Sequence, residues 1–335
     1  MTRLRYLDCA KGLGILCISF LHYENGVLSG PANTFIGTFM ITIFYVVTGW
    51  LMAMKESRDT TRVLAAKRLR SLGLPYLYWT GIILAFDCIL WAAGYYSSYF
   101  VAREAYKSVV LRGIGTLWFL PALFFGEIGW NWLRNKRKLW WIVALVIIMA
   151  YTHYYYVTFA HATGSTMKIV QAPFHTISNA LRAVLYVASG YLCCKLYSKI
   201  QLTAFAEGCV GLGLCILAYY SVSNLHSLLG AVSWLFWPFI APVLGPVGFI
   251  LIFKSLYASR LLNFFDYWGR NSLSLMVTHY SIVQVCATII IVNLLGLSFT
   301  GWTTIIAFIC SLPIQYLITE GLNRYAPQLI RPRKK

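Results

Sequence analysis

A cation and an imidazole share one face of the first hydrophobic segment. Lys11 and His22 are separated by ten uncharged residues. At about 100° per residue, eleven steps return the two side chains to nearly the same azimuth, and at about 1.5 Å rise per residue they lie roughly 16 Å apart along a helix axis. Ionisable groups are costly in hydrocarbon, so this spacing indicates function. His22 titrates near neutrality and could serve as a general base toward a hydroxyl.

Neighbouring acids offer structural roles for the same residues. Asp8 lies three residues before Lys11, which predicts an i,i+3 ion pair that does not exclude a catalytic role. Glu24 points away from His22 if the helix continues, but it could turn back and orient the imidazole if the helix ends at Asn25-Gly26. His22 could also be an interfacial histidine bonded to backbone or water.

A second group of candidate residues is basic. Lys67, Arg68 and Arg70 precede Pro75, which would start or kink a helix. Such a cluster suits the phosphates of a charged ligand. The alternative is that these are ordinary cytoplasmic cations at a helix entry.

The composition places these residues in a membrane protein. Hydrophobic residues make up 59% of the chain and charged residues only 11%. The 12 Trp and 23 Tyr fit interfacial aromatic belts. The net charge of +18 does not indicate nucleic-acid binding, because the basic residues lie in short loops between apolar spans.

We predict an all-α, polytopic integral membrane protein with a single domain over residues 1–335. Hydrophobic periodicity predicts about ten transmembrane helices. These spans lie near 7–26, 34–54, 73–94, 114–133, 139–158, 178–197, 203–221, 229–253, 272–296 and 301–320.

Basic residues set the predicted orientation. The N-terminus, four loops and the C-terminus on one side hold 22 of the 28 Lys and Arg. The opposite side has five: Arg103, Lys107, Arg112, Lys168 and Arg182. The positive-inside rule therefore places both termini in the cytoplasm. Lys11 then lies near the cytoplasmic end of the first helix and His22 near its outer end.

Cysteine and histidine spacing gives no metal or disulfide signature. The nine Cys lie mostly within spans, without a Cys-x-x-Cys pair. The outer segment Tyr151–Ser178 contains His153, His161 and His175, whose gaps fit no compact ligand motif. Its tyrosines could stack on sugars or form an interfacial belt. Two acids within spans, Asp87 and Glu127, could pair with intramembrane cations.

Four segments, in order, resemble the membrane acyltransferase-3 family. The first is Leu7 to Gly12 followed by His22, since the family carries Arg or Lys, ten residues, then His; here Lys11 keeps the charge but loses the forked donor set of Arg. The others are Lys67 to Tyr76, Gly115 to Leu120, and Gly269 to Leu273 followed by His279. The resemblance covers residues from about 5 to about 280.

This resemblance implies an O-acyltransferase that uses cytoplasmic acyl-CoA, most often acetyl-CoA, as co-substrate and needs no metal. The acceptor would be a hydroxyl of a cell-surface glycan or a lipid-linked sugar. The resemblance also implies a multi-pass integral membrane protein, located in a bacterial cytoplasmic membrane. The implied site has His22, Lys11 and Glu24 at the catalytic centre. The implied donor-binding residues are Lys67, Arg68, Arg70, Trp118, Asn271, Ser272 and His279.

In the mechanism that follows, His22 takes the acceptor proton and Trp118 or Asn271 stabilises the oxyanion. An acyl-histidine intermediate is the main variant. His279 shares a helical face with Ser272 and could instead be a buried histidine that ties helices together. Two other functions stay open: a transporter or flippase for a lipid-linked glycan, and a structural subunit of a glycan-export complex.

Overall fold

The computed structural model describes residues 3–55, 59–159, 165–229 and 240–330. All regular elements in these ranges are helices, which confirms the predicted all-α class. Six helices are long and apolar enough to cross a membrane: Gly30–Met54, Thr61–Ala92, Ile169–Tyr197, Ala204–Val222, Ser272–Leu294 and Trp302–Tyr325. They correspond to six of the predicted spans.

The other four predicted spans also contain helices. These are α1 (Arg5–Tyr23), α7 (Phe119–Leu133), α8 (Lys138–Phe159) and α12 (Ile240–Ser255). The beginning of the predicted span 229–253 lies outside the described residues. The total of ten spans and the cytoplasmic termini stay predictions.

Two helices begin earlier than the membrane spans predicted within them. The span expected at 73–94 begins at Thr61, and α9 (Ser165–Tyr197) begins well before residue 178. Arg62, Lys67, Arg68 and Arg70 make the early part of the first of these helices too polar to be recognised from hydrophobicity. His175, in the segment predicted to lie on the outer side, is part of the helix α9.

The chain divides into two compact units. Unit 1 comprises residues 1–57, 186–275 and 287–313, and unit 2 comprises residues 58–185, 276–286 and 314–335. Unit 1 contains α1, α2 (Gly30–Phe39), α3 (Thr42–Met54), α10 (Ala204–Leu229), α12, α13 (Leu262–Arg270), the start of α14 (Ser272–Thr278), η5 (Ile289–Leu294) and part of α16 (Trp302–Tyr325).

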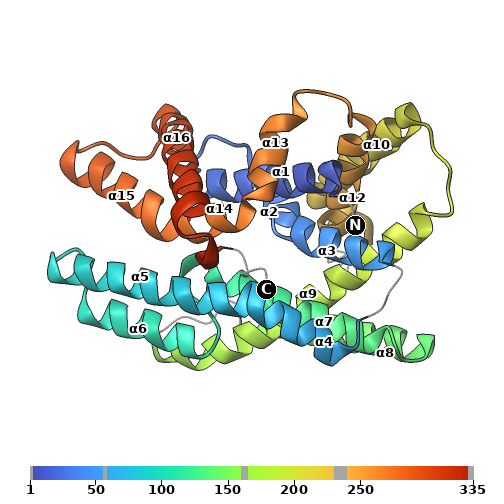
Figure 1. Ribbon diagram of the computed structural model, residues 1–335, viewed down its shortest axis with the longest axis horizontal. Coiled ribbons are helices and arrows are strands. Elements are labelled where there is room, and N and C mark those ends of the chain that lie inside the picture. The colour runs from blue at the N-terminus through green and yellow to red at the C-terminus, as the bar shows by residue number, and fades with distance from the viewer. Residues whose placement is uncertain (1–2, 56–58, 160–164, 230–239, 331–335) are drawn as a thin grey trace. The chain divides into compact units, whose positions relative to one another are not determined.

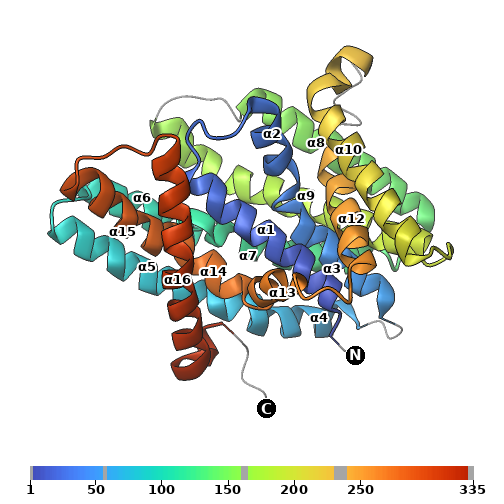
Figure 2. The ribbon, with the colours of Figure 1, turned by 90° about the horizontal axis from the view of Figure 1, so that it is seen from above.

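Close helix contacts in unit 1 depend on glycine. In Figure 1, α10 and α12 lie side by side, where Gly211 and Gly248 let the two backbones approach. Figure 2 shows α13 against the N-terminal half of α1. There a Cβ on Gly269 would overlap the Asp8 carbonyl oxygen, and one on Gly12 would overlap the Phe265 carbonyl oxygen. Small residues thus permit the backbone contact that membrane helices commonly use.

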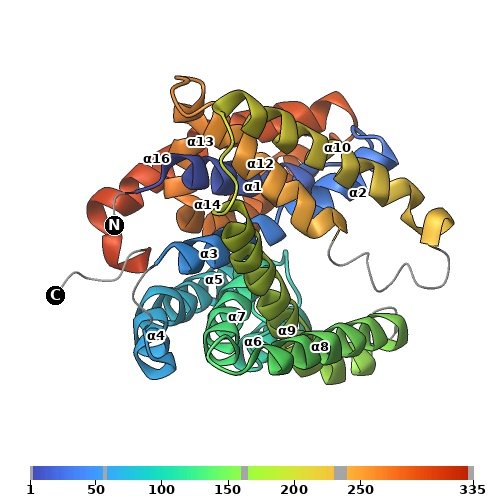
Figure 3. The same ribbon diagram turned by 90° about the vertical axis from the view of Figure 1, so that its right-hand side faces the viewer.

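Unit 2 contains the helices of residues 58–185 and two later segments of the chain. They are α4 (Thr61–Arg68), η1 (Leu69–Gly73), α5 (Leu74–Ala92), α6 (Ser98–Val109), η2 (Gly115–Trp118), α7, α8 and α9 up to residue 185. The η4 segment (His279–Gln284), the end of α16 and η6 (Pro327–Leu329) complete it. Figure 3 shows α4 and α7 neighbouring one another.

Pro75 explains an irregular turn in the first long helix of unit 2. Proline has no N–H to donate to the carbonyl of Ser71, and its ring crowds that carbonyl. The helix widens instead to the π geometry of η1, where the Leu74 amide donates to the Leu69 carbonyl five residues back. Single π turns occur often at functional sites, and this one carries Arg70.

The α1–α13 contact predicts an asymmetry between two glycine substitutions. We expect Gly269→Ala to lower the thermal stability of the purified protein by about 1–3 kcal/mol or more, because the new methyl group meets backbone rather than a movable side chain. Gly213→Ala, in open space on α10, is the control and should be neutral or stabilising. Equal melting temperatures for Gly269→Ala and wild type would contradict this packing.

Candidate active site

His22 is the last residue but one of α1, and it is partly exposed. The helix ends at Tyr23, since Glu24 has extended backbone torsions. Phe20 packs edge-to-face on Phe308 with ring centroids 5.2 Å apart. Tyr23 packs on Phe299 at 6.0 Å. Aromatic contacts to the C-terminal part of unit 1 thus position the imidazole end of α1.

Glu24 organises the turn that follows α1. Its Oε1 accepts hydrogen bonds from the Val27 amide at 2.9 Å and the Leu28 amide at 3.0 Å. Its Oε2 accepts from the Asn33 side-chain amide at 3.2 Å. The chain turns directly after Tyr23, as the Asn25-Gly26 alternative required. These bonds give Glu24 a structural function, and its predicted part in orienting His22 stays a prediction.

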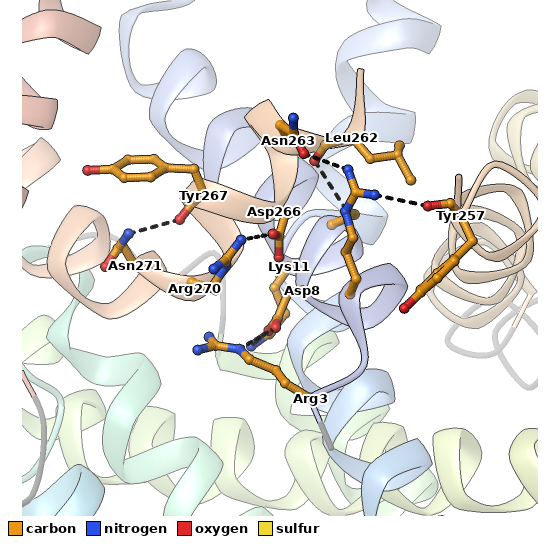
Figure 4. Close-up of polar contacts among 12 residues, drawn as sticks. Arg3, Asp8, Lys11, Tyr257, Leu262, Asn263, Asp266, Tyr267, Arg270 and Asn271 are labelled. Atoms are coloured by element: carbon orange, nitrogen blue, oxygen red, sulfur yellow. Dashed lines mark hydrogen bonds and ion pairs between the residues drawn. The ribbon is translucent and has the colours of Figure 1, made fainter. Parts of the chain in front are cut away.

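Lys11 lies in a network of charges at the other end of α1. Its Nζ is 2.7 Å from Asp8 Oδ1, which confirms the predicted i,i+3 pair. Asp8 is buried and also accepts from Arg3 at 2.6 Å. Figure 4 shows these residues beside Asp266, which pairs with Arg270 on α13. The four-residue spacing of Asp266 and Arg270 was readable in the sequence but was not used.

Asn271 forms the junction between α13 and α14. Its Nδ2 donates to the Tyr267 carbonyl at 3.0 Å (Figure 4). Its own carbonyl accepts from the Leu275 amide. Asn271 is 8% exposed, and Ser272 begins α14. The side chain therefore satisfies a free helix end. Donation to an oxyanion is a further role that the contacts leave as a prediction.

The basic cluster of unit 2 is partly neutralised within the protein. Lys67 pairs with Asp59 at 2.9 Å, while Arg68 Nε lies 2.5 Å from Oε2 of the buried Glu127 on α7. Glu127 thus pairs with a cation, one of the outcomes expected for it. Within the described part of the chain, Arg70 forms no ion pair, and its side chain is exposed. Arg70 is therefore available to an external anion.

Two of the motifs singled out in the sequence meet in unit 2. The turn Gly115–Trp118 packs on the π segment η4, where a Cβ on Gly115 would crowd Tyr280 and Ser281. Thr116 Oγ1 also donates to the Met276 carbonyl at 2.6 Å. His279 is buried at the start of η4, and Trp118 is partly exposed. The turn that carries Trp118 is therefore packed on the segment that carries His279.

The predicted site residues fall into two sets, each gathered in one unit. Unit 1 holds Lys11, His22, Glu24, Asn271 and Ser272. Unit 2 holds Lys67, Arg68, Arg70, Trp118 and His279. Sequence reasoning did not identify Glu127 as the partner of Arg68, because 59 residues separate them.

A comparison with protein families supports the motif resemblance. The family model described as "Acyltransferase domain", of the acyltransferase-3 type, matches residues 4–320. This confirms the resemblance over essentially the whole chain. No match was found among curated proteins or solved structures.

The two ion pairs of the basic cluster predict different stability effects. Glu127→Gln should destabilise the protein by about 1–3 kcal/mol, since it removes the charge that faces Arg68 in a buried position. Lys67→Gln breaks an exposed pair and should change stability by less than about 1 kcal/mol. Thermal unfolding in detergent measures both. A larger loss for Lys67→Gln would mean that burial does not decide the strength of these pairs.

Two substitutions distinguish the hydrogen-bond acceptor function of Glu24 from its negative charge. Glu24→Gln keeps an acceptor oxygen for the Val27 and Leu28 amides, whereas Glu24→Ala removes it. If Glu24 organises the turn, Gln should keep thermal stability within about 0.5 kcal/mol, and Ala should lose about 1–2 kcal/mol. Acyl transfer measured beside stability then distinguishes the roles. Stable Glu24→Gln protein with strongly reduced transfer would instead support a charged orienting group for His22.

Proposed function

Because this chain belongs to the acyltransferase-3 family, we propose that it transfers an acetyl group from cytoplasmic acetyl-CoA to a hydroxyl of a cell-surface glycan or lipid-linked sugar. Family membership and six candidate spans support a membrane acyltransferase. The observation that carries the finer proposal is the Lys11-to-His22 face within the matched region. We place the protein in a bacterial cytoplasmic membrane with both termini inside.

Donor binding is assigned to the basic cluster of unit 2. Acyl-CoA carries several phosphate charges, and arginine presents a planar set of donors to phosphate oxygens. Arg70 is exposed on the π turn, and Arg68 is held by its Nε contact to Glu127. Lys67 is mostly exposed and its pair with Asp59 is at the surface, so a phosphate could replace the carboxylate at small cost.

The acyl-transfer step is assigned to His22. An imidazole nitrogen takes the proton of the acceptor hydroxyl as that oxygen attacks the thioester carbonyl. The C–O bond forms, and the tetrahedral intermediate then breaks its C–S bond. The CoA thiolate leaves and takes the proton from the imidazolium, which restores neutral His22. In the covalent variant, the neutral His22 imidazole attacks the thioester carbonyl and displaces the CoA thiolate. The acceptor oxygen then displaces the imidazole from the acyl-histidine, and the hydroxyl proton passes to the thiolate.

Several other residues assist in this scheme. Trp118 Nε1–H or Asn271 Nδ2–H would donate to the oxyanion during the transfer. Lys11, held by Asp8, would line the route of the pantetheine arm along the α1 face. Ser272 and His279 would contact the donor. The transporter alternative lacks support of this kind, because the matched family consists of acyltransferase domains.

The experiment measures binding and consumption of labelled acetyl-CoA by purified protein. His22→Ala should bind the donor and lose transfer by about 10²–10⁴-fold, because the general base is removed. Arg70→Ala should weaken donor binding with its chemistry otherwise intact. Arg62→Ala, another exposed arginine on the same long helix, is the matched control and should bind acetyl-CoA normally.

Two outcomes would overturn the proposal. Full transfer by a well-folded His22→Ala protein would remove His22 from the mechanism. If wild type neither binds nor consumes acetyl-CoA, and a longer acyl-CoA gives the same result, the acyl-CoA donor is wrong.

A further inference from the structure

Four side chains from three segments of unit 2 lie near one another. Tyr155 on α8 and His175 on α9 pack edge-to-face with ring centroids 5.2 Å apart. Arg112, from the loop after α6, and Arg182, on α9, both act electrostatically on this Tyr155–His175 pair. The hydrogen bond from Thr176 to the Val110 carbonyl brings the Arg112 loop to α9 beside His175, so two cationic residues lie within electrostatic range of one aromatic pair. We name these four residues the arginine–aromatic cluster.

The backbone holds Arg112 firmly in this position. The amides of Arg112 and Gly113 both donate to the Lys107 carbonyl, at 2.8 and 3.1 Å, which closes the end of α6. Leu111 takes a positive φ of 58°, which is uncommon for a side-chain-bearing residue. Thr176 Oγ1 donates to the Val110 carbonyl at 2.9 Å, so the loop is joined to α9 one residue after His175.

The charge of Arg112 has little compensation within the protein. Arg112 is partly buried, and desolvation lowers its pKa below the ordinary value, although the group stays charged. No carboxylate among the described residues forms an ion pair with it; Glu104 acts on it only at longer range and pairs with Arg103 and Lys107 instead. A partly buried guanidinium without a paired anion is costly, so a bound anion would stabilise it.

We propose that the arginine–aromatic cluster binds the anionic group of the acyl acceptor. Arginine pairs bind carboxylate and phosphate through forked hydrogen bonds. Tyr155 is buried, so its ring packs against His175 and does not face a ligand. The anion is either the carboxylate of an acidic sugar or the phosphate of a lipid-linked sugar. This inference rests on the proposed function and on the predicted topology, in which these segments face the outer side.

The test is a binding experiment that needs no acyl donor. Purified protein in zwitterionic-lipid nanodiscs is titrated against two labelled probes, a glucuronate oligosaccharide and a polyprenyl-pyrophosphate-linked N-acetylglucosamine. A neutral glucose oligosaccharide of the same length is the ligand control. We expect saturable binding of one charged probe, which identifies the source of the anion. Arg112→Gln and Arg182→Gln should each weaken it by about 10-fold or more.

Arg103→Gln is the matched protein control. It removes one guanidinium from the same predicted side of the membrane, but that group is already paired with Glu104 and should not matter for binding. Equal weakening in all three variants would reduce the effect to general electrostatics and overturn the site. Absence of saturable binding of either charged probe to wild type would also overturn it.

Two further measurements keep the result interpretable. If Arg112→Gln fails to fold, Arg112→Lys keeps the charge but loses the fork; unchanged binding in both Arg112→Lys and Arg182→Gln would contradict the site. Consumption of acetyl-CoA by wild type is measured in parallel. Probe binding without donor consumption refutes the proposed function but not the anion site. Donor consumption without probe binding refutes the anion site alone.

Discussion

The cost of an unpaired charge in an apolar protein interior governs much of this structure. Several buried carboxylates are neutralised by nearby cations: Asp8 by Arg3 and Lys11, Glu127 by Arg68, and Glu207 by Lys254. Buried Asp87 on α5 has no ion pair among the described residues, so it does not follow this rule. A buried pair adds little stability by itself, but loss of one partner leaves a costly charge. The Arg68–Glu127 and Glu207–Lys254 pairs join different helices and therefore restrict where those helices can lie, whereas the pairs of Asp8 hold side chains within the start of α1.

Charge pairing operates together with close backbone contact. Glycine at positions 12 and 269 brings α13 against α1 beside Asp8 and Lys11, so Lys11 lies in a network of charges rather than in open lipid. In unit 2, Pro75 widens the helix at η1 and so alters the direction of Arg70 relative to a regular helix. Local backbone chemistry and pairing thus determine which cations are held and which are exposed.

Local information predicted part of this arrangement. The Asp8–Lys11 pair followed from i,i+3 spacing, and the helical class followed from hydrophobic periodicity. The Arg68–Glu127 pair could not be predicted, because it depends on how α4 packs on α7. The early start of the Thr61 helix was missed since its cations conceal an amphipathic face, and the function of Glu24 depended on a turn beyond the helix end.

The cost of an unpaired charge also applies to the cations that have no carboxylate partner within the protein. The chain has 28 Lys and Arg but only 10 Asp and Glu, so internal pairing must leave many cations without a carboxylate. Exposed ones are solvated at little cost, whereas Arg112 is partly buried and held in place by the backbone. A fixed, desolvated cation binds an anion with little further ordering. Under the proposed function, Arg112 would bind an anion of the acceptor in this way, while the exposed Arg70 would meet the phosphates of the donor.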